Sequence, residues 1–148
     1  MAGWLFILLV PLFIDVCYTD ARYRIIRNHT TLLVAFLCAG GSFFSPAGCF
    51  WLPALCILLG GFFLSLFNII GAGDIKLMAA LALSFDAETT LAFLFSTALA
   101  GLPLIFIIFI LNFFSSRFYG RKNKKNLPYG IAIVSGYLAT SLLLRVPA

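Results

Sequence analysis

The stretch Gly71-Ala72-Gly73-Asp74-Ile75-Lys76-Leu77 interrupts an otherwise apolar chain. A carboxylate and an ammonium group two residues apart are costly at the mouth of a membrane helix, so they point to a function. Gly71 and Gly73 leave the backbone beside Asp74 free of side chains, and a substrate strand could approach it closely. The alternative is a plain helix break in which Lys76 extends to the membrane surface. This stretch alone leaves both interpretations open.

The composition indicates whether the chain lies in water or in a membrane. Of 148 residues, 63% are hydrophobic and only 10% are charged, and the mean hydropathy is +1.10. A soluble domain of this size cannot bury so much apolar surface, so the chain is expected to lie in lipid. Its apolar runs are continuous rather than alternating, which indicates helices and not a barrel. We therefore predict one all-α, polytopic membrane domain over residues 1–148.

Six apolar runs are the expected transmembrane helices, and the loops between them differ in charge. The runs are about Trp4–Tyr18, Thr31–Phe44, Phe50–Ile70, Leu77–Phe85, Leu91–Phe114 and Ile131–Leu144. The first, third and fifth loops hold nine of the ten Lys and Arg residues. By the positive-inside rule these loops face the cytoplasm and both termini lie outside. The same distribution argues against a nucleic-acid partner.

Two acidic residues stand out from the other three. Asp86 and Glu88 belong to an outer loop, and Asp15 does not share a helix face with Asp20. Asp20, in the polar loop expected at Thr19–Asn28, and Asp74 each end an apolar run on the cytoplasmic side. Two carboxylates in a partly desolvated cleft share one proton, as in aspartic proteases, where they activate water and polarise the scissile carbonyl.

The depth of Asp74 predicts where this cleft lies. Asp74 precedes Asp86 by twelve residues, or roughly 18 Å of helix, and a hydrocarbon core is about 30 Å thick. If Asp86 marks the outer interface, Asp74 sits below the cytoplasmic surface of the membrane. We therefore expect a recessed, hydrated catalytic cleft that faces the cytoplasm, with both aspartates open to it.

These residues resemble the motifs of the type IV prepilin peptidases, which are membrane aspartic proteases. The Gly71–Leu77 stretch is similar to their glycine-x-glycine-aspartate signature. Their first catalytic aspartate precedes a basic segment, which Asp20, Arg22, Arg24, Ile26 and Asn28 match, and Pro128-Tyr129-Gly130 resembles their proline-aromatic-glycine element. The chain departs from the family at Arg27 and Ile131, where the family usually has proline.

The resemblance implies an activity, a site and partners. It implies a bacterial inner-membrane endopeptidase that removes basic leader peptides from prepilins or pseudopilins, with Asp20 and Asp74 catalytic and no metal or other cofactor. Further site residues by resemblance are Gly71, Gly73, Lys76, Asn28, Pro128 and Gly130. The expected partners are the leader-bearing substrate, the lipid bilayer and pilus or secretion assembly proteins. We expect the short, peptidase-only form that serves tight-adherence (Flp-type) pili, without an N-terminal methyltransferase-type extension.

Two other interpretations remain open at this point. A presenilin-like protease would cut inside a transmembrane segment, but Arg22 and Arg24 place Asp20 near the cytoplasmic rim rather than at mid-membrane. A small transporter or assembly subunit could use the two acids as a proton or cation site. Such a transporter more often shows an internal repeat or paired broken helices, and the sequence contains neither.

Overall fold

The computed structural model describes residues 3–43, 50–67, 70–119 and 129–143 of the chain. These residues form six helices and no strand, as the sequence predicts. The helices are α1 (Gly3–Tyr23), α2 (Asn28–Phe43), α3 (Trp51–Leu66), α4 (Ala72–Ala82), α5 (Ala87–Tyr119) and α6 (Tyr129–Leu143).

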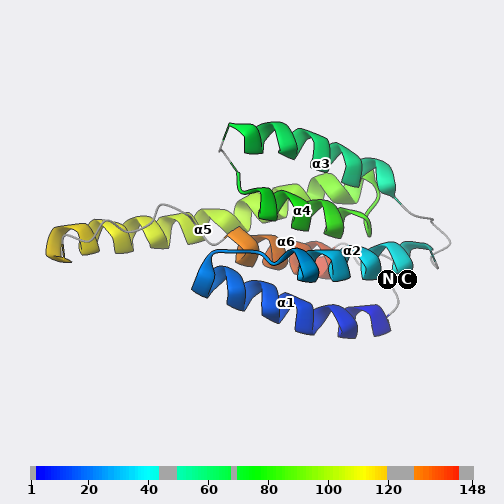
Figure 1. Ribbon diagram of the computed structural model, residues 1–148, viewed down its shortest axis with the longest axis horizontal. Helices are drawn as coiled ribbons and strands as arrows, with labels where there is room; N and C mark the ends of the chain where they lie inside the picture. The colour runs from blue at the N-terminus through cyan, green and yellow to red at the C-terminus, as the bar shows by residue number, and fades with distance from the viewer. Residues whose placement is uncertain (1–2, 44–49, 68–69, 120–128, 144–148) are drawn as a thin grey trace.

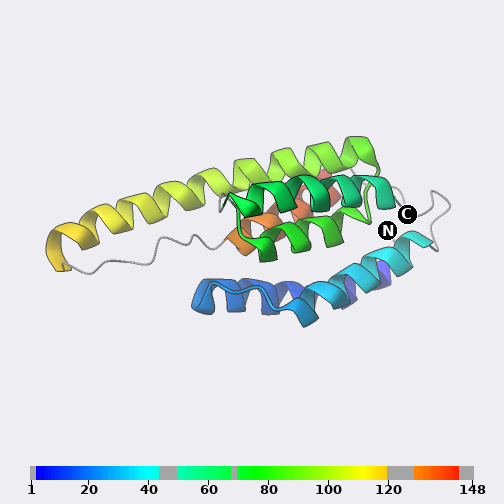
Figure 2. The same cartoon turned by 45° about the horizontal axis from the view of Figure 1, so that its top comes forward.

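The helices run roughly along one axis, with α4 and α6 inside the bundle (Figure 1). The main helix pairs are α5 with α6, α3 with α4, α2 with α4, and α1 with α2 and with α6. The end of α1 and the beginnings of α4 and α6 lie at the same end of the bundle, while α5 extends beyond it (Figures 1 and 2). This common end carries Asp20, in the last turn of α1, and Asp74, in the first turn of α4.

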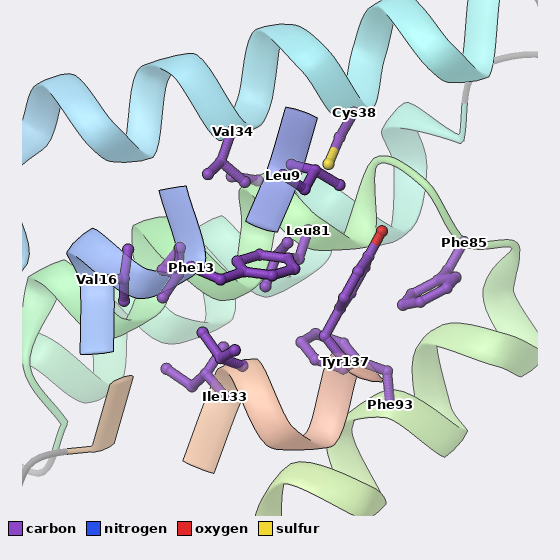
Figure 3. Packing of buried hydrophobic residues seen from close by; sticks show 13 residues of the cluster. Leu9, Phe13, Val16, Val34, Cys38, Leu81, Phe85, Phe93, Ile133 and Tyr137 are labelled. Atoms are coloured by element: carbon purple, nitrogen blue, oxygen red, sulfur yellow. The ribbon is translucent and has the colours of Figure 1, made fainter. Parts of the chain in front are cut away.

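An aromatic cluster around Tyr137 joins the helices that carry this end. The Tyr137 ring lies 5.4 Å from that of Phe13 on α1 and 6.1 Å from that of Phe93 on α5. The ring of Phe85, between α4 and α5, is 5.0 Å away. Figure 3 shows these rings packed with aliphatic side chains such as Leu81. Buried aromatic pairs of this kind add about 0.5–1.5 kcal/mol each beyond their area, so they fix α1 against α6.

Glycine allows α5 and α6 to pack closely. A Cβ built at Gly136 would lie 2.7 Å from both the Cα and the backbone N of Thr97. Real Cβ atoms do not approach backbone atoms so closely, so any side chain at Gly136 would force the two helices apart. The contact is the small-residue packing that is common between membrane helices.

The prediction of a polar loop at Thr19–Asn28 is wrong, because α1 continues through Tyr23 and leaves only residues 24–27 as a connector. Arg24 then adopts a left-handed conformation (φ 55°), and its N–H donates to the Asp20 carbonyl over 2.9 Å. This is a helix C-terminal motif that is more usual for glycine. The apolar run stopped at Tyr18, but helical hydrogen bonding does not require apolar residues, so the helix carries Asp20 within it.

The glycine-aspartate stretch was also expected to interrupt the helices, yet most of it belongs to α4. The helix begins at Ala72, with Gly71 as its extended N-cap residue. Asp74 therefore lies in the first helical turn, where the positive end of the helix dipole favours a carboxylate.

The described part of the chain contains one helical segment, Ala87–Ile107, that is long and apolar enough to cross a bilayer. The helices Trp51–Leu66 and Tyr129–Leu143 are apolar but shorter. Large apolar side chains cover the outside of α3, where Phe62 and Phe63 are about 60% exposed. Exposed apolar surface on this scale is not typical of a soluble monomer.

Candidate active site

Asp20, in the last turn of α1, is held by the first turn of α6. Its carboxylate Oδ2 accepts a hydrogen bond from the backbone N–H of Gly130 over 2.6 Å. The backbone amide of Ile131 also interacts with this carboxylate. Amide groups at a helix N-terminus are well placed to bind a carboxylate. The residue is only 4% exposed, so its carboxylate is buried against the start of α6 and does not face open solvent.

Gly130 is a glycine for a reason that involves Asp20. A Cβ at Gly130 would lie 2.8 Å from Asp20 Oδ2 and 3.1 Å from Asp20 Cβ. Any side chain here would displace the carboxylate from the amide that binds it. The sequence assigned Gly130 to a motif but gave no sign of this contact, because the two residues are 110 positions apart.

Asp74 lies beside a cavity of about 730 Å³, whose lining also includes Tyr129 from the start of α6. Asp74 is only partly buried. Its Oδ2 is 2.9 Å from the position of a Cβ built at Gly71, so the carboxylate folds back over the helix start in space that only glycine leaves. Gly71 itself is exposed, which keeps the backbone beside Asp74 accessible.

The two aspartates, 54 positions apart in the sequence, are close enough for their charges to interact. Tyr129 and Gly130 connect them, since Tyr129 borders the cavity of Asp74 and Gly130 binds Asp20. The fold thus brings both acids to the same end of the bundle, and their pairing in catalysis stays a prediction. Among the described residues, His, Cys, Asp and Glu side chains form no group of three that could hold a metal ion.

Gly73 has a different neighbour from the one expected. A Cβ at Gly73 would lie 3.3 Å from the Cβ of Ile26, in the connector between α1 and α2. The space above Gly73 is thus filled by the protein itself, whereas Gly71 is exposed beside the Asp74 carboxylate. The close approach of the connector to α4 keeps the end of α1 near Asp74.

Lys76 lies on the face of α4 opposite Asp74, as the helical spacing predicts. Its Nζ donates to the side-chain oxygen of Asn28, the first residue of α2, over 3.3 Å. Both residues border a second cavity of about 550 Å³ between α2, α3 and α4. The structure thus separates Lys76 and Asn28 from the aspartate pair. Pro128, expected at the site by resemblance, lies outside the described residues.

Asp15 joins α1 to α2 rather than entering the aspartate pair. Its Oδ2 accepts a hydrogen bond from the hydroxyl of Thr30 over 2.7 Å, and its Oδ1 lies 3.5 Å from Nη1 of Arg27. These contacts fix the connector that carries Ile26 onto Gly73. Asp15 therefore holds α1, the connector and the start of α2 together.

Comparison with known proteins bears on this arrangement. Searches among curated proteins and solved structures gave no match. The model of the type IV leader peptidase family matches residues 6–106, a span that includes Asp20, Asp74 and the glycines beside Asp74. Because this match covers more than half of the chain, the protein belongs to the type IV leader peptidase family.

Proposed function

We propose that the chain is a membrane aspartic endopeptidase that removes basic leader peptides from prepilin-like substrates at the cytoplasmic face of the membrane. Family membership supports the leader-peptidase activity. The observation that carries the aspartic mechanism is the placement of Asp20 and Asp74 at one end of the bundle, where their charges interact and Asp74 borders a cavity.

In this mechanism the two carboxylates hold one proton between them. Two carboxyl groups that interact with each other and are partly removed from water do not both ionise readily. One acid therefore carries a proton while the other remains ionised. The ionised carboxylate takes a proton from water as the water attacks the scissile carbonyl, and the protonated acid donates to the carbonyl oxygen. The Gly130 amide fixes Asp20 in place, and Asp74 meets the substrate from the cavity.

The bilayer is the proposed environment for the whole chain, as a single domain over residues 1–148 in a bacterial inner membrane. The exposed apolar surface and the apolar span Ala87–Ile107 support this placement. The charge of the loops supports a cytoplasmic active site and two termini outside. A substrate anchored in the same membrane would then present its cytoplasmic leader junction at the end of the bundle where the aspartates meet.

The test is cleavage by the purified full chain in liposomes. The resemblance to prepilin peptidases implies a cut after a glycine just before the apolar helix of the substrate, so the test substrate carries a basic leader, that glycine and an apolar helix. Mass spectrometry identifies the bond that is broken. We expect one cut after the glycine, and no cut when a bulky residue replaces that glycine. Cleavage within the apolar helix would favour the presenilin-like alternative, and no cleavage of any prepilin-like substrate would contradict the proposal.

A further inference from the structure

The cavity at Asp74 is a groove between α3 and α5, two helices that make few contacts with each other. Its walls are α3 and α5, and residues of α4 and α6 line its base. The packing partner of α3 is α4, and no side chain of α3 belongs to the central core cluster. The fold therefore leaves a space along α3 and α5 that its own core does not fill.

Small residues line both walls of this groove. Gly60 and Gly61 border it from α3, and Ala98 and Gly101 border it from α5. Gly61 packs closely on Ile75 of α4, and Gly101 is buried. A Cβ built at Gly60 meets no atom within 4 Å, and Ala98 is exposed, so neither position is used in internal packing. Small residues on facing surfaces let a further helix approach the backbone closely within a membrane.

The chemistry of the groove is graded along its length. Its polar groups include Asp74 and Tyr129 at the end where α4 and α6 begin, and apolar side chains provide most of the remaining lining. On α5 the lining extends from Leu94 to Ile105, about 16 Å of helix. That length matches about ten residues of an apolar helix whose polar end lies at Asp74.

We propose that the groove between α3 and α5 binds the apolar helix of the substrate on the C-terminal side of the scissile bond. This inference rests on the proposed leader-peptidase function. Seated there, the helix presents the peptide bond at its cytoplasmic end to Asp74. The cavity on the opposite face of α4 contains Lys76 but not Asp74, so a substrate bound in it would lie on the wrong side of α4.

A native cysteine allows a direct test of occupancy. Cys56 is exposed on α3 and borders the groove, about 15 Å from the end of that helix at Leu66. In Asp20→Asn, which is expected to bind but not cleave, we place single cysteines in the substrate about 8–12 residues beyond the scissile bond and oxidise them. We expect disulfides with Cys56 that recur every three to four substrate positions.

Two matched variants show which surface is occupied. Cys56→Ser should abolish the disulfide, and Leu32→Cys in that background places an exposed thiol on the opposite cavity and should form none. Equal crosslinking at both sites would overturn the proposal that the groove binds the substrate helix. The absence of crosslinks at Cys56, with a substrate that the wild type cleaves, would overturn it too.

Cleavage rates give an independent measurement. Gly60→Leu and Ala98→Leu fill the groove from opposite walls and should slow cleavage at least tenfold at normal protein levels in the membrane. Gly40→Leu, at another glycine with open space, should cleave as the wild type does. Wild-type rates in both groove variants would overturn the inference alone, whereas a wild type that cleaves no prepilin-like substrate would overturn the proposed function and this inference with it.

Discussion

Replacing Gly130 by alanine tests whether the start of α6 positions Asp20 for catalysis. The added methyl group would lie 2.8 Å from Asp20 Oδ2, so the carboxylate must move and lose its 2.6 Å hydrogen bond to the backbone N–H. A hydrogen bond to a charged group is worth about 1.5–3 kcal/mol. If this contribution is needed in the transition state, cleavage slows about 10- to 150-fold.

The free energy of unfolding should fall by less than the cleavage barrier rises in this variant. Alanine is favoured over glycine within a helix by roughly 0.5–1 kcal/mol, which offsets part of the lost hydrogen bond. The assay is the initial rate of leader cleavage in liposomes, with thermal unfolding in detergent measured in parallel. Gly40→Ala, where the new methyl group meets no neighbour, is the matched control. A rate for Gly130→Ala within twofold of wild type would refute the positioning of Asp20 by α6.

Two further predictions concern the packing that supports the site. Gly136→Ala forces α5 and α6 apart at Thr97, and overpacking of this kind costs about 1–3 kcal/mol, so we expect a lower midpoint of thermal unfolding in detergent; an unchanged midpoint would contradict the close contact. Asp15→Ala leaves the hydroxyl of buried Thr30 without its carboxylate partner, at a cost of about 1–3 kcal/mol. The expected result is lower stability with slower cleavage. Thr30→Ser keeps the hydroxyl and should retain most of the wild-type stability and cleavage rate.

The helices were predictable because each follows from a local physical constraint. A continuous apolar run must satisfy its backbone hydrogen bonds internally, so six runs predict six helices. Carboxylates in so apolar a chain are costly, which drew attention to Asp20 and Asp74. The helix ends were not predictable in the same way, because the run of apolar residues ends at Tyr18 while α1 reaches Tyr23.

The contacts that organise the site were beyond the sequence because they join distant segments. Gly73 was expected to admit substrate, yet it admits Ile26 of the connector. Gly130 was a motif position without a role, and the fold places its amide on Asp20. A glycine in a sequence indicates that something comes close to the backbone, but only the fold shows what that neighbour is.

The most direct test of the paired-aspartate mechanism is leader cleavage by Asp20→Asn, Asp74→Asn and the double variant, with immunoblots to confirm equal amounts in the membrane. Asp86→Asn is the control, because asparagine can keep the hydrogen bond that Asp86 accepts from the Thr89 amide at the start of α5. We predict that each single substitution lowers the rate at least about 100-fold and that the double variant is no worse, since the two acids act as a unit. Normal cleavage by either single variant would contradict the mechanism.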